Sequence, residues 1–341
     1  MIGQDSHEVE RKTLAILGVL NASREPLGGR AIADRLGLQG INLCERTVRY
    51  HLKLMDERGL TQFEGRRDGR SITPKGIEEL ESALVGDRMG SIASKMEALS
   101  YQSTLDSGNG SGQVPINTSI VDAFDLNATV DAMQVAFDAG FYISDRITVA
   151  YGGESLGAGV IPAGRVGLAT VSSIAVIGAL LKEGIPLDPR FGGILEIKHG
   201  QPVRFVELIE YSGCSLNPME IFAVSKFTSV RSASSIGNGR ILAHFHEIPA
   251  VCRDAAELVI ENVRNIGING LITLGQPNEP ICEMSVEPNK VGMVLHSGLN
   301  PLAAAIEMGI NVMPHAMSGV IGTNQLVSYK QLEVDTECIE Y

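Results

Sequence analysis

The segment "ERTVRYHLKLMDERGL" at residues 45–60 carries the pattern that decides the N-terminal fold. Its apolar residues repeat at the spacing of one helix face, at Val48, Leu52 and Met55. Gly59 follows this pattern and is a typical helix end. We therefore predict a helix from Cys44 to Arg58 that buries one face and presents basic and polar side chains on the other.

The flanking sequence predicts a small unit around this helix. Two helical patterns precede it, "EVERKTLAILGVLNAS" at residues 8–23 and "GGRAIADRLG" at residues 28–37, and "LTQFEGRRDGRSITPKG" at residues 60–76 predicts a β-hairpin. Three helices and a basic hairpin are the order of a winged helix-turn-helix, whose third helix enters the major groove of DNA. The candidate DNA contacts are Arg46, Thr47, Arg49, Tyr50, Lys53, Arg66, Arg67 and Arg70.

The charge distribution supports the same division of the chain. The 341 residues carry a formal charge of −12, yet residues 1–81 balance 13 basic against 13 acidic side chains. Residues 46–75 alone hold eight basic and four acidic groups. This pattern indicates a module that faces a polyanion, attached to an acidic body that would repel one. The alternative is a solvated basic helix in a protein–protein module of the same fold.

Composition excludes several other classes of protein. An apolar content of 44% and a charged content of 20% are typical of an ordinary globular chain. The uncharged run at residues 166–181 is too short and polar for a membrane span, and the N-terminal residues are too polar for a signal peptide. Five scattered cysteines without a CxxC pair fit a reducing cytoplasm. We expect a cytoplasmic protein without a membrane partner or a bound metal.

An internal repeat organises the larger part of the chain. "VGLATVSSIAVIGALLKEGI" at residues 166–185 aligns without gaps to "VGMVLHSGLNPLAAAIEMGI" at residues 291–310, with six identities. Each copy predicts a strand, a polar turn and a helix. We therefore expect an N-terminal domain at residues 1–85 and an α/β (α+β) regulatory domain at residues 86–341. This second domain would contain two similar halves, roughly residues 120–200 and 250–330, with a cleft between them.

The polar turns of the repeat are the candidate ligand site. Backbone N–H groups and serine hydroxyls at helix starts bind anions, so two facing turns could hold a dicarboxylate, one carboxylate each. Plain helix capping is the alternative interpretation of the same residues. A strand-ending loop, "GGES" at residues 152–155, and one arginine among small polar residues complete the set. The candidates are Gly153, Glu154, Ser155, Thr170, Ser172, Ser173, Arg231, His296, Ser297 and Asn300.

Several segments together resemble the regulatory domain of the NrpR family, the nitrogen-responsive repressors of methanogenic and related archaea. They are "FDAGFYIS", "GGESLGAGVIPAGRVGLATV", "LLKEGIP", "FGGILE", "SLNPMEIF", "TSVRSA", "HEIPAV" and "SGLNPLAAAIEMGI". The resemblance implies a transcriptional repressor of nitrogen-assimilation and nitrogen-fixation genes. It implies a homodimer or higher oligomer that binds double-stranded operator DNA and is released by the effector 2-oxoglutarate, without a cofactor.

Two departures from the family pattern leave alternatives open. Family members often carry a cysteine where this chain has Ser172, and many carry two regulatory domains where residues 86–341 have room for one. A corepressor adaptor that acts through a homologous DNA-binding partner is therefore an alternative. A metabolic enzyme with a winged-helix appendage is a weaker one, because no nucleophile elbow, catalytic triad pattern or dinucleotide fingerprint is present in the sequence. We expect a protein that is not an enzyme.

Overall fold

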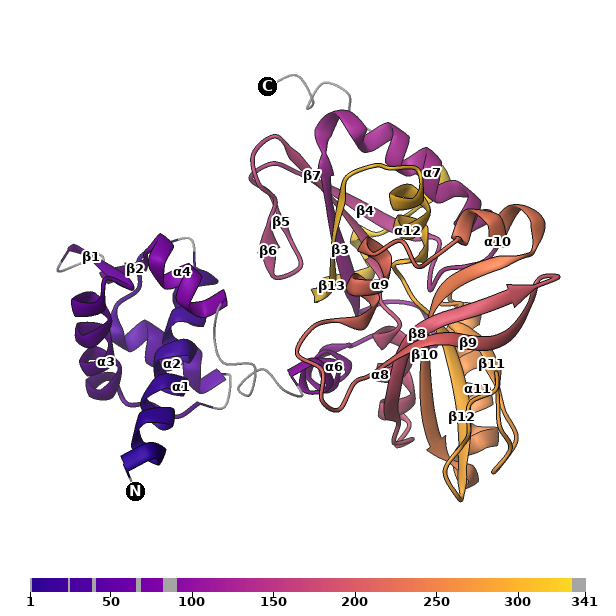
Figure 1. Cartoon of the computed structure of the whole chain (residues 1–341), viewed down its shortest axis with the longest axis horizontal. Helices are drawn as coiled ribbons and strands as arrows, with labels where there is room; N and C mark the ends of the chain where they lie inside the picture. The colour runs from indigo at the N-terminus through magenta and orange to yellow at the C-terminus, as the bar shows by residue number, and fades with distance from the viewer. Residues whose placement is uncertain (1, 24, 39–40, 66–68, 82–90, 333–341) are drawn as a thin grey trace. The chain divides into compact units, whose positions relative to one another are not determined.

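The structure is a computed structural model that describes residues 2–332 except 24, 39–40, 66–68 and 82–90. The chain divides into two compact units, residues 1–88 and residues 89–341, and each is described by itself (Figure 1). Within the described residues, the helices are all too short or too polar to traverse a lipid bilayer.

The N-terminal unit is the predicted winged helix-turn-helix. Its elements are α1 (Ile2–Asn21), α2 (Gly29–Leu38), α3 (Glu45–Arg58), β1 (Thr61–Gly65), β2 (Gly69–Ile72) and α4 (Pro74–Glu81). Val48, Leu52 and Met55 of α3 are buried in one core with side chains of α1 and α2, as the spacing predicted. The helix ends where Gly59 takes a left-handed conformation with φ of 72°, which a residue without a side chain adopts at little cost.

The wing is anchored to the helices through its second strand. Leu27 and the arginine at position 70 exchange two backbone hydrogen bonds, N to O, of 2.9 and 3.0 Å. Gly69 is required beside this bridge, because a Cβ atom there would collide with the backbone carbonyl of Leu27. The hairpin tip at residues 66–68, with the predicted Arg66 and Arg67, lies outside the described residues.

The larger unit contains two five-stranded antiparallel sheets (Figure 1). The strands of the first sheet, in spatial order, are β13 (Val312–Gly322), β3 (Gln113–Asp122), β7 (Arg165–Val171), β4 (Arg146–Tyr151) and β14 (Val327–Ser328). Those of the second are β11 (Leu271–Leu274), β12 (Lys290–His296), β10 (Gly239–Pro249), β8 (Asp188–Lys198) and β9 (Gln201–Glu210). The helices are α6 (Ser91–Gln102), α7 (Leu126–Asp138), α8 (Ile174–Lys182), α9 (Pro218–Val224), α10 (Val230–Ile236), α11 (Arg253–Asn265) and α12 (Asn300–Glu307).

The internal repeat corresponds to two halves with the same order of elements. The first half runs β3, α7, β4, β7, α8, β8, and the second runs β10, α11, β11, β12, α12, β13. The aligned segments at residues 166–185 and 291–310 are the strand–turn–helix units of β7–α8 and β12–α12. Each half begins earlier than expected, because its first strand, β3 or β10, precedes the region that the alignment covered.

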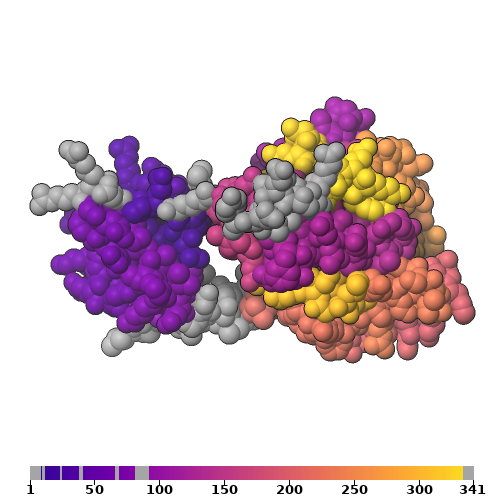
Figure 2. Space-filling view, turned by 90° about the horizontal axis from the view of Figure 1, so that it is seen from above, coloured from indigo at the N-terminus to yellow at the C-terminus, as the bar shows by residue number. Residues whose placement is uncertain are grey.

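Each half also gives its last strand to the sheet of the other half. Strand β8 ends the first half but pairs with β10, and β13 ends the second half but pairs with β3. One continuous hydrophobic core results, with buried residues from both sheets. In the space-filling view of the larger unit, the yellow C-terminal segment accordingly borders the magenta first half (Figure 2).

The N-terminal start of this unit differs from the sequence interpretation. The residues "SYQST" at 100–104 favour a strand before the glycine-rich turn, but α6 continues to Gln102. Ile92, Met96 and Leu99 explain the difference, because they repeat at helical spacing and are all buried. Burial of this helix face outweighs the β propensity of the residues that follow it.

Replacement of Leu52 by alanine should destabilise the N-terminal unit by about 2–5 kcal/mol, because the side chain is fully buried. The unfolding transition of residues 89–341 should keep its midpoint, since the two units have separate cores. Calorimetry of the full chain measures both transitions. Leu258→Ala removes the same atoms at an exposed position and should change neither transition by more than about 0.5 kcal/mol. A shift of both transitions in Leu52→Ala would contradict independent folding of the units.

Candidate functional site

The exposed face of α3 gathers most of the predicted DNA-contact residues. Arg46, Arg49, Tyr50 and Lys53 are exposed, while the intervening apolar residues are buried. Tyr50 is 61% exposed, unusual for so large an aromatic side chain. Thr47 is half-buried, and its hydroxyl lies 3.1 Å from the sulfur of Cys44 at the start of the helix. The arrangement is a cationic helix surface with a protruding aromatic ring.

Two of the predicted cations have carboxylate partners within the unit. Arg49 lies 2.5 Å from Glu45 on the same exposed helix face. Arg70 lies 2.7 Å from Asp56, and its guanidinium group stands over the ring of Phe63 at 5.2 Å. Arg70 is therefore turned toward the helices rather than outward, which differs from the expected contact with the DNA backbone. The pair with Asp56 attaches the wing to α3.

In the larger unit, a small cavity lies where the two halves meet. Its volume is about 20 Å³, room for roughly one water molecule in the conformation described. The turns before α8 and α12 both reach it, at residues 172–173 (the first turn) and residues 297–298 (the second turn). The lining residues are Met96, Asn117, Ser172, Ser173, Ile174, Tyr211, Asn217, Met219, His244, Ser297, Gly298, Leu299, Ala316 and Met317. Among the described residues, no arginine or lysine contributes to this lining.

The two turns present the same polar groups to the cavity. The Ser172 hydroxyl accepts from the N–H of Ile174 at 3.4 Å, and the Ser297 hydroxyl accepts from the N–H of Leu299 at 3.2 Å. Each hydroxyl therefore keeps its own hydrogen for another acceptor. The N–H groups of Ser173 and Gly298 have no acceptor in the part of the chain that the structure describes. Each turn thus offers one N–H and one O–H donor.

Gly298 is required by the close approach of the halves. A Cβ atom at this position would collide with the carbonyl oxygen of Val171 and would lie 2.6 Å from Nδ2 of Asn117. The second turn therefore packs directly on the end of β7 from the other half. The carbonyl oxygen of the Asn117 side chain accepts from the N–H of Met317 at 3.0 Å, which fixes the orientation of its amide.

A tyrosine–histidine pair forms another part of the cavity wall. The hydroxyl of Tyr211 lies 2.6 Å from Nδ1 of His244, and both side chains are buried. Burial lowers the pKa of His244 to about 4 and raises the pKa of Tyr211, so both are neutral near pH 7. His246 stacks on both rings and is fully buried, and neither of its nitrogens has a partner among the described residues.

Several of the predicted ligand residues lie outside the cavity lining. Asn300 is used structurally, because its amide binds the N–H and the carbonyl of Leu242 on β10 at 2.8 and 3.0 Å. His296 packs on Phe141 at 5.9 Å, and Thr170 is buried within β7. Arg231 lies on α10, where its guanidinium contacts the sulfur of Met308, the residue after α12. Gly153, Glu154 and Ser155 belong to the arm that forms the small hairpin β5 (Ser155–Leu156) and β6 (Gly159–Val160).

The sequence interpretation therefore placed Ser172, Ser173 and Ser297 correctly in one cavity, and it missed the side chains that face them. Asn117, Tyr211 and Asn217 had no pattern that pointed to a site. The repeat itself could have pointed to Asn117 and His244, since they occupy equivalent positions of β3 and β10, the first strands of the two halves.

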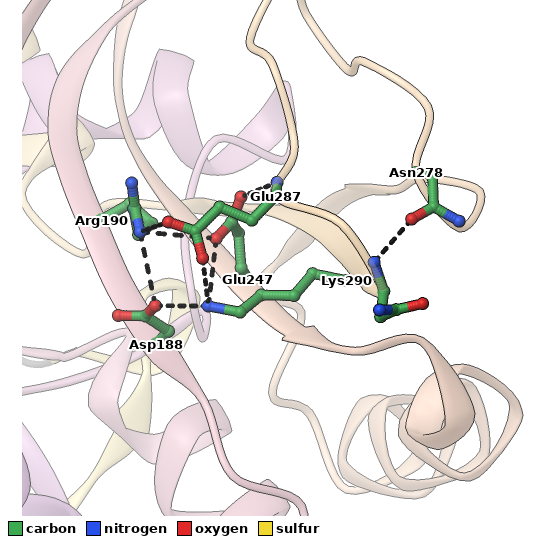
Figure 3. A network of polar contacts seen from close by, with 7 residues as sticks. Asp188, Arg190, Glu247, Asn278, Glu287 and Lys290 are labelled. Carbon is green, nitrogen blue, oxygen red and sulfur yellow. Dashed lines mark hydrogen bonds and ion pairs between the residues drawn. The ribbon is translucent and has the colours of Figure 1, made fainter.

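An ion-pair network lies at the edge of the second sheet where β8 and β12 begin (Figure 3). Carboxylate oxygens of Asp188, Glu247 and Glu287 lie within 4.8 Å of one another. Lys290 contacts Asp188 at 2.7 Å and Glu247 at 3.4 Å, and Arg190 contacts Glu287 at 2.5 Å. Two cations therefore already stand where a metal ion would bind these carboxylates. The corresponding position of the first half, Arg165, forms a simpler pair with Asp122 at 2.8 Å.

Comparison with known proteins gives the family. The family described as "NrpR regulatory domains NRD1 and 2" matches residues 89–328, and the family "Ribonuclease R winged-helix domain" matches residues 14–80. The global nitrogen regulator NrpRI of Methanosarcina mazei is 36% identical over 92% of this chain and 96% of its own length. The chain belongs to the NrpR family.

Two other NrpR relatives match this chain over about half of their own length. The global nitrogen regulators NrpR of Methanococcus maripaludis and Methanocaldococcus jannaschii are 32% and 31% identical over 86% and 95% of the chain. The match spans 51% and 56% of those two proteins, about half their length. The crystal structure of a nitrogen repressor-like protein from Methanococcus jannaschii superimposes with a TM-score of 0.59 at 30% identity, over 69% of this chain and 97% of that one.

The buried histidines should make this NrpR-type unit sensitive to acid. Burial lowers the pKa of His244 to about 4 and that of His296 to about 3, whereas both titrate near 6.5 in the unfolded chain. Because the unfolded state binds these protons first, stability should be complete above about pH 6.5 and fall toward pH 4. The loss should reach up to about 1.4 kcal/mol per pH unit for each histidine.

Denaturant unfolding at a series of pH values, followed by circular dichroism, measures this slope. His296→Phe should flatten it, and His315→Gln, at an exposed position, should leave it unchanged. The same slope in His296→Phe and in the unmodified protein would contradict the assignment.

Proposed function

We propose that the chain is a nitrogen-responsive transcriptional repressor of nitrogen-assimilation and nitrogen-fixation genes. In this proposal the winged helix binds operator DNA, and 2-oxoglutarate in the cavity between the halves causes its release. The observation that carries the proposal is the matched pair of donor turns in one cavity, attached to a unit with an exposed cationic helix. Membership of a family whose curated members are named global nitrogen regulators supports it.

The DNA-binding part of the proposal rests on α3. Arginines and a lysine on its exposed face suit guanine edges and phosphates, and an exposed helix of a winged helix-turn-helix enters the major groove. Residues 82–341 carry the whole net charge of −12, so this part of the chain repels DNA. A dimer would place two such helices about 34 Å apart to reach successive major grooves.

The effector part rests on the chemistry of the two turns. 2-Oxoglutarate carries a carboxylate at each end, and each turn offers an N–H and a serine O–H. Because the lining described here has no arginine or lysine, backbone dipoles and hydroxyls would hold the anion, as they do at other helix starts. The cavity is largely shielded from solvent, which strengthens such hydrogen bonds.

The coupling between the two parts is a shift of population. A ligand changes operator affinity only when it binds one conformation of the protein more tightly than the other. A hundredfold preference for the DNA-free conformation would correspond to about 2.7 kcal/mol. The cavity as described is too small for 2-oxoglutarate, so the effector would bind a conformation in which the two turns have moved apart, and its preference for that conformation would shift the population.

A second candidate is a corepressor adaptor that acts through a homologous DNA-binding partner. The observation that favours it is the neutralisation of two cations of the DNA-binding unit, Arg49 by Glu45 and Arg70 by Asp56. Operator binding by the pure chain separates the two candidates, since an adaptor would bind operator DNA weakly by itself.

Arg49→Ala should weaken operator binding by roughly 5- to 100-fold, because it removes a cation from the groove-facing surface of α3. Glu45→Gln should have the opposite effect, since it releases Arg49 from its carboxylate partner. Electrophoretic mobility shifts or fluorescence anisotropy at fixed salt measure both. Lys198→Ala, an exposed lysine of the larger unit, is the matched control and should change nothing. Equal effects of Arg49→Ala and Lys198→Ala would contradict a specific role for α3.

Addition of 2-oxoglutarate should lower the operator affinity of the full chain, and the double change Ser172→Ala and Ser297→Ala should abolish that response. Loss of each hydroxyl that binds a carboxylate should weaken effector binding about 10- to 150-fold, because hydrogen bonds to charged groups contribute about 1.5–3 kcal/mol. Calorimetric titration measures binding, and anisotropy measures the response. Ser232 on α10 donates its hydroxyl hydrogen to the backbone carbonyl of Asn238, so Ser232→Ala controls for loss of a serine elsewhere. An operator affinity that is the same with and without 2-oxoglutarate would rule out the coupling.

A further inference from the structure

The cavity is symmetric in its turns but not in its walls. Asn117 on β3 pairs with Thr170 on β7, and His244 on β10 pairs with Leu295 on β12. Thr170 and Leu295 occupy the same position of the internal repeat. Asn117 and His244 are therefore equivalent residues of the two halves, and they face one cavity with different chemistry. A ligand with two different ends can be oriented by this difference.

The structure also determines which nitrogen of His244 carries hydrogen. Tyr211 is 2% exposed, and the only partner of its hydroxyl among the described residues is Nδ1 of His244. If Nδ1 carried a hydrogen, the buried tyrosine hydroxyl would have no acceptor, which costs about 1–3 kcal/mol. The arrangement that satisfies both groups has Tyr211 donate to Nδ1, so the hydrogen of the neutral imidazole resides on Nε2.

Nε2 of His244 is an unpartnered donor of this wall, as are the side-chain nitrogens of Asn117 and Asn217 among the described residues. The side chain is 8% exposed and lines the cavity, and its Nε2 contacts no acceptor in the described part of the chain. The other two polar wall residues are already engaged through their oxygens, Asn117 with the N–H of Met317 and Asn217 with the N–H of Met219. Of these three, His244 is the one whose ring is locked by a second buried side chain.

We propose that His244, oriented by Tyr211, donates a hydrogen bond from Nε2 to the 2-oxo oxygen of a 2-oxo dicarboxylate and thereby sets the direction in which the ligand binds. This inference rests on the proposed effector function of the cavity. The two carboxylates take the two matched turns, so the oxo oxygen is the acceptor that distinguishes the ends. Asn117 lies against the second turn. Because His244 is the equivalent residue of the other half, the repeat places it against the first turn. The 2-oxo end therefore binds at Ser172 and Ser173, and the distal carboxylate at Ser297 and Gly298.

Glutarate is the probe for this contact, because it has both carboxylates and lacks the oxo group. Calorimetric titration of the full chain should show at least about a tenfold preference for 2-oxoglutarate, since glutarate leaves the Nε2 donor unpaired. His244→Phe should reduce this preference to within about twofold while leaving glutarate affinity nearly unchanged. Tyr211→Phe keeps the ring but frees the imidazole to change tautomer, and it should lower the preference severalfold.

His246→Phe is the matched control. It is the same substitution on the same strand and in the same ring stack, but the residue does not line the cavity, and the preference should persist. Should His244→Phe fail to fold, Tyr211→Phe still tests the proposal. Binding of 2-oxoglutarate with the same preference in His244→Phe and Tyr211→Phe as in the unmodified chain would overturn the role of His244 and leave the effector function standing. Absence of 2-oxoglutarate binding by the unmodified chain would overturn both.

Discussion

The exchange of the strands β8 and β13 between the two halves is the constraint on which the larger unit depends. Each sheet takes one strand from the other half, so neither half can satisfy all backbone hydrogen bonds of its own first strand, β3 or β10. Interlocked halves have one core rather than two, and their relative position is specified by strand register. Strand pairing sets the positions of the two turns that form the cavity, because both turns follow strands of the interlocked sheets.

Buried polar groups at the junction are paired in a way that leaves a few donors for a ligand. Asn300 satisfies both backbone groups of Leu242, and Asn117 satisfies the N–H of Met317. The donors that remain without protein partners in the described residues, the N–H groups of Ser173 and Gly298, point to an anion because nothing else at the junction accepts from them. Both serine hydroxyls accept from the N–H two residues further on, as the capping interpretation expects, and contact with a ligand is a proposal beyond it.

The fold of the N-terminal unit has a different physical basis from that of the larger unit. Its fold follows from one buried stripe on α3 and a wing held by a backbone bridge at Leu27. Its charge is balanced overall but uneven on the surface, with carboxylates such as Glu45 and Asp56 beside the cations. Such a surface attracts DNA through a few residues, so specificity depends on where those residues lie rather than on net charge.

The sequence by itself determined the features that are local in the chain. Periodicity specified α3 and the wing, the charge count separated the two units, and the repeat with its polar turns identified Ser172, Ser173 and Ser297; the family resemblance extended over both units. Only the tertiary structure decided which strands exchange, that Asn300 and Arg70 have structural partners, and that Asn117, Tyr211 and His244 face the turns. The physical reason is the sequence separation of the interacting residues. Helix periodicity and turns depend on neighbouring residues, whereas the walls of the cavity come from strands whose pairing depends on the whole sheet.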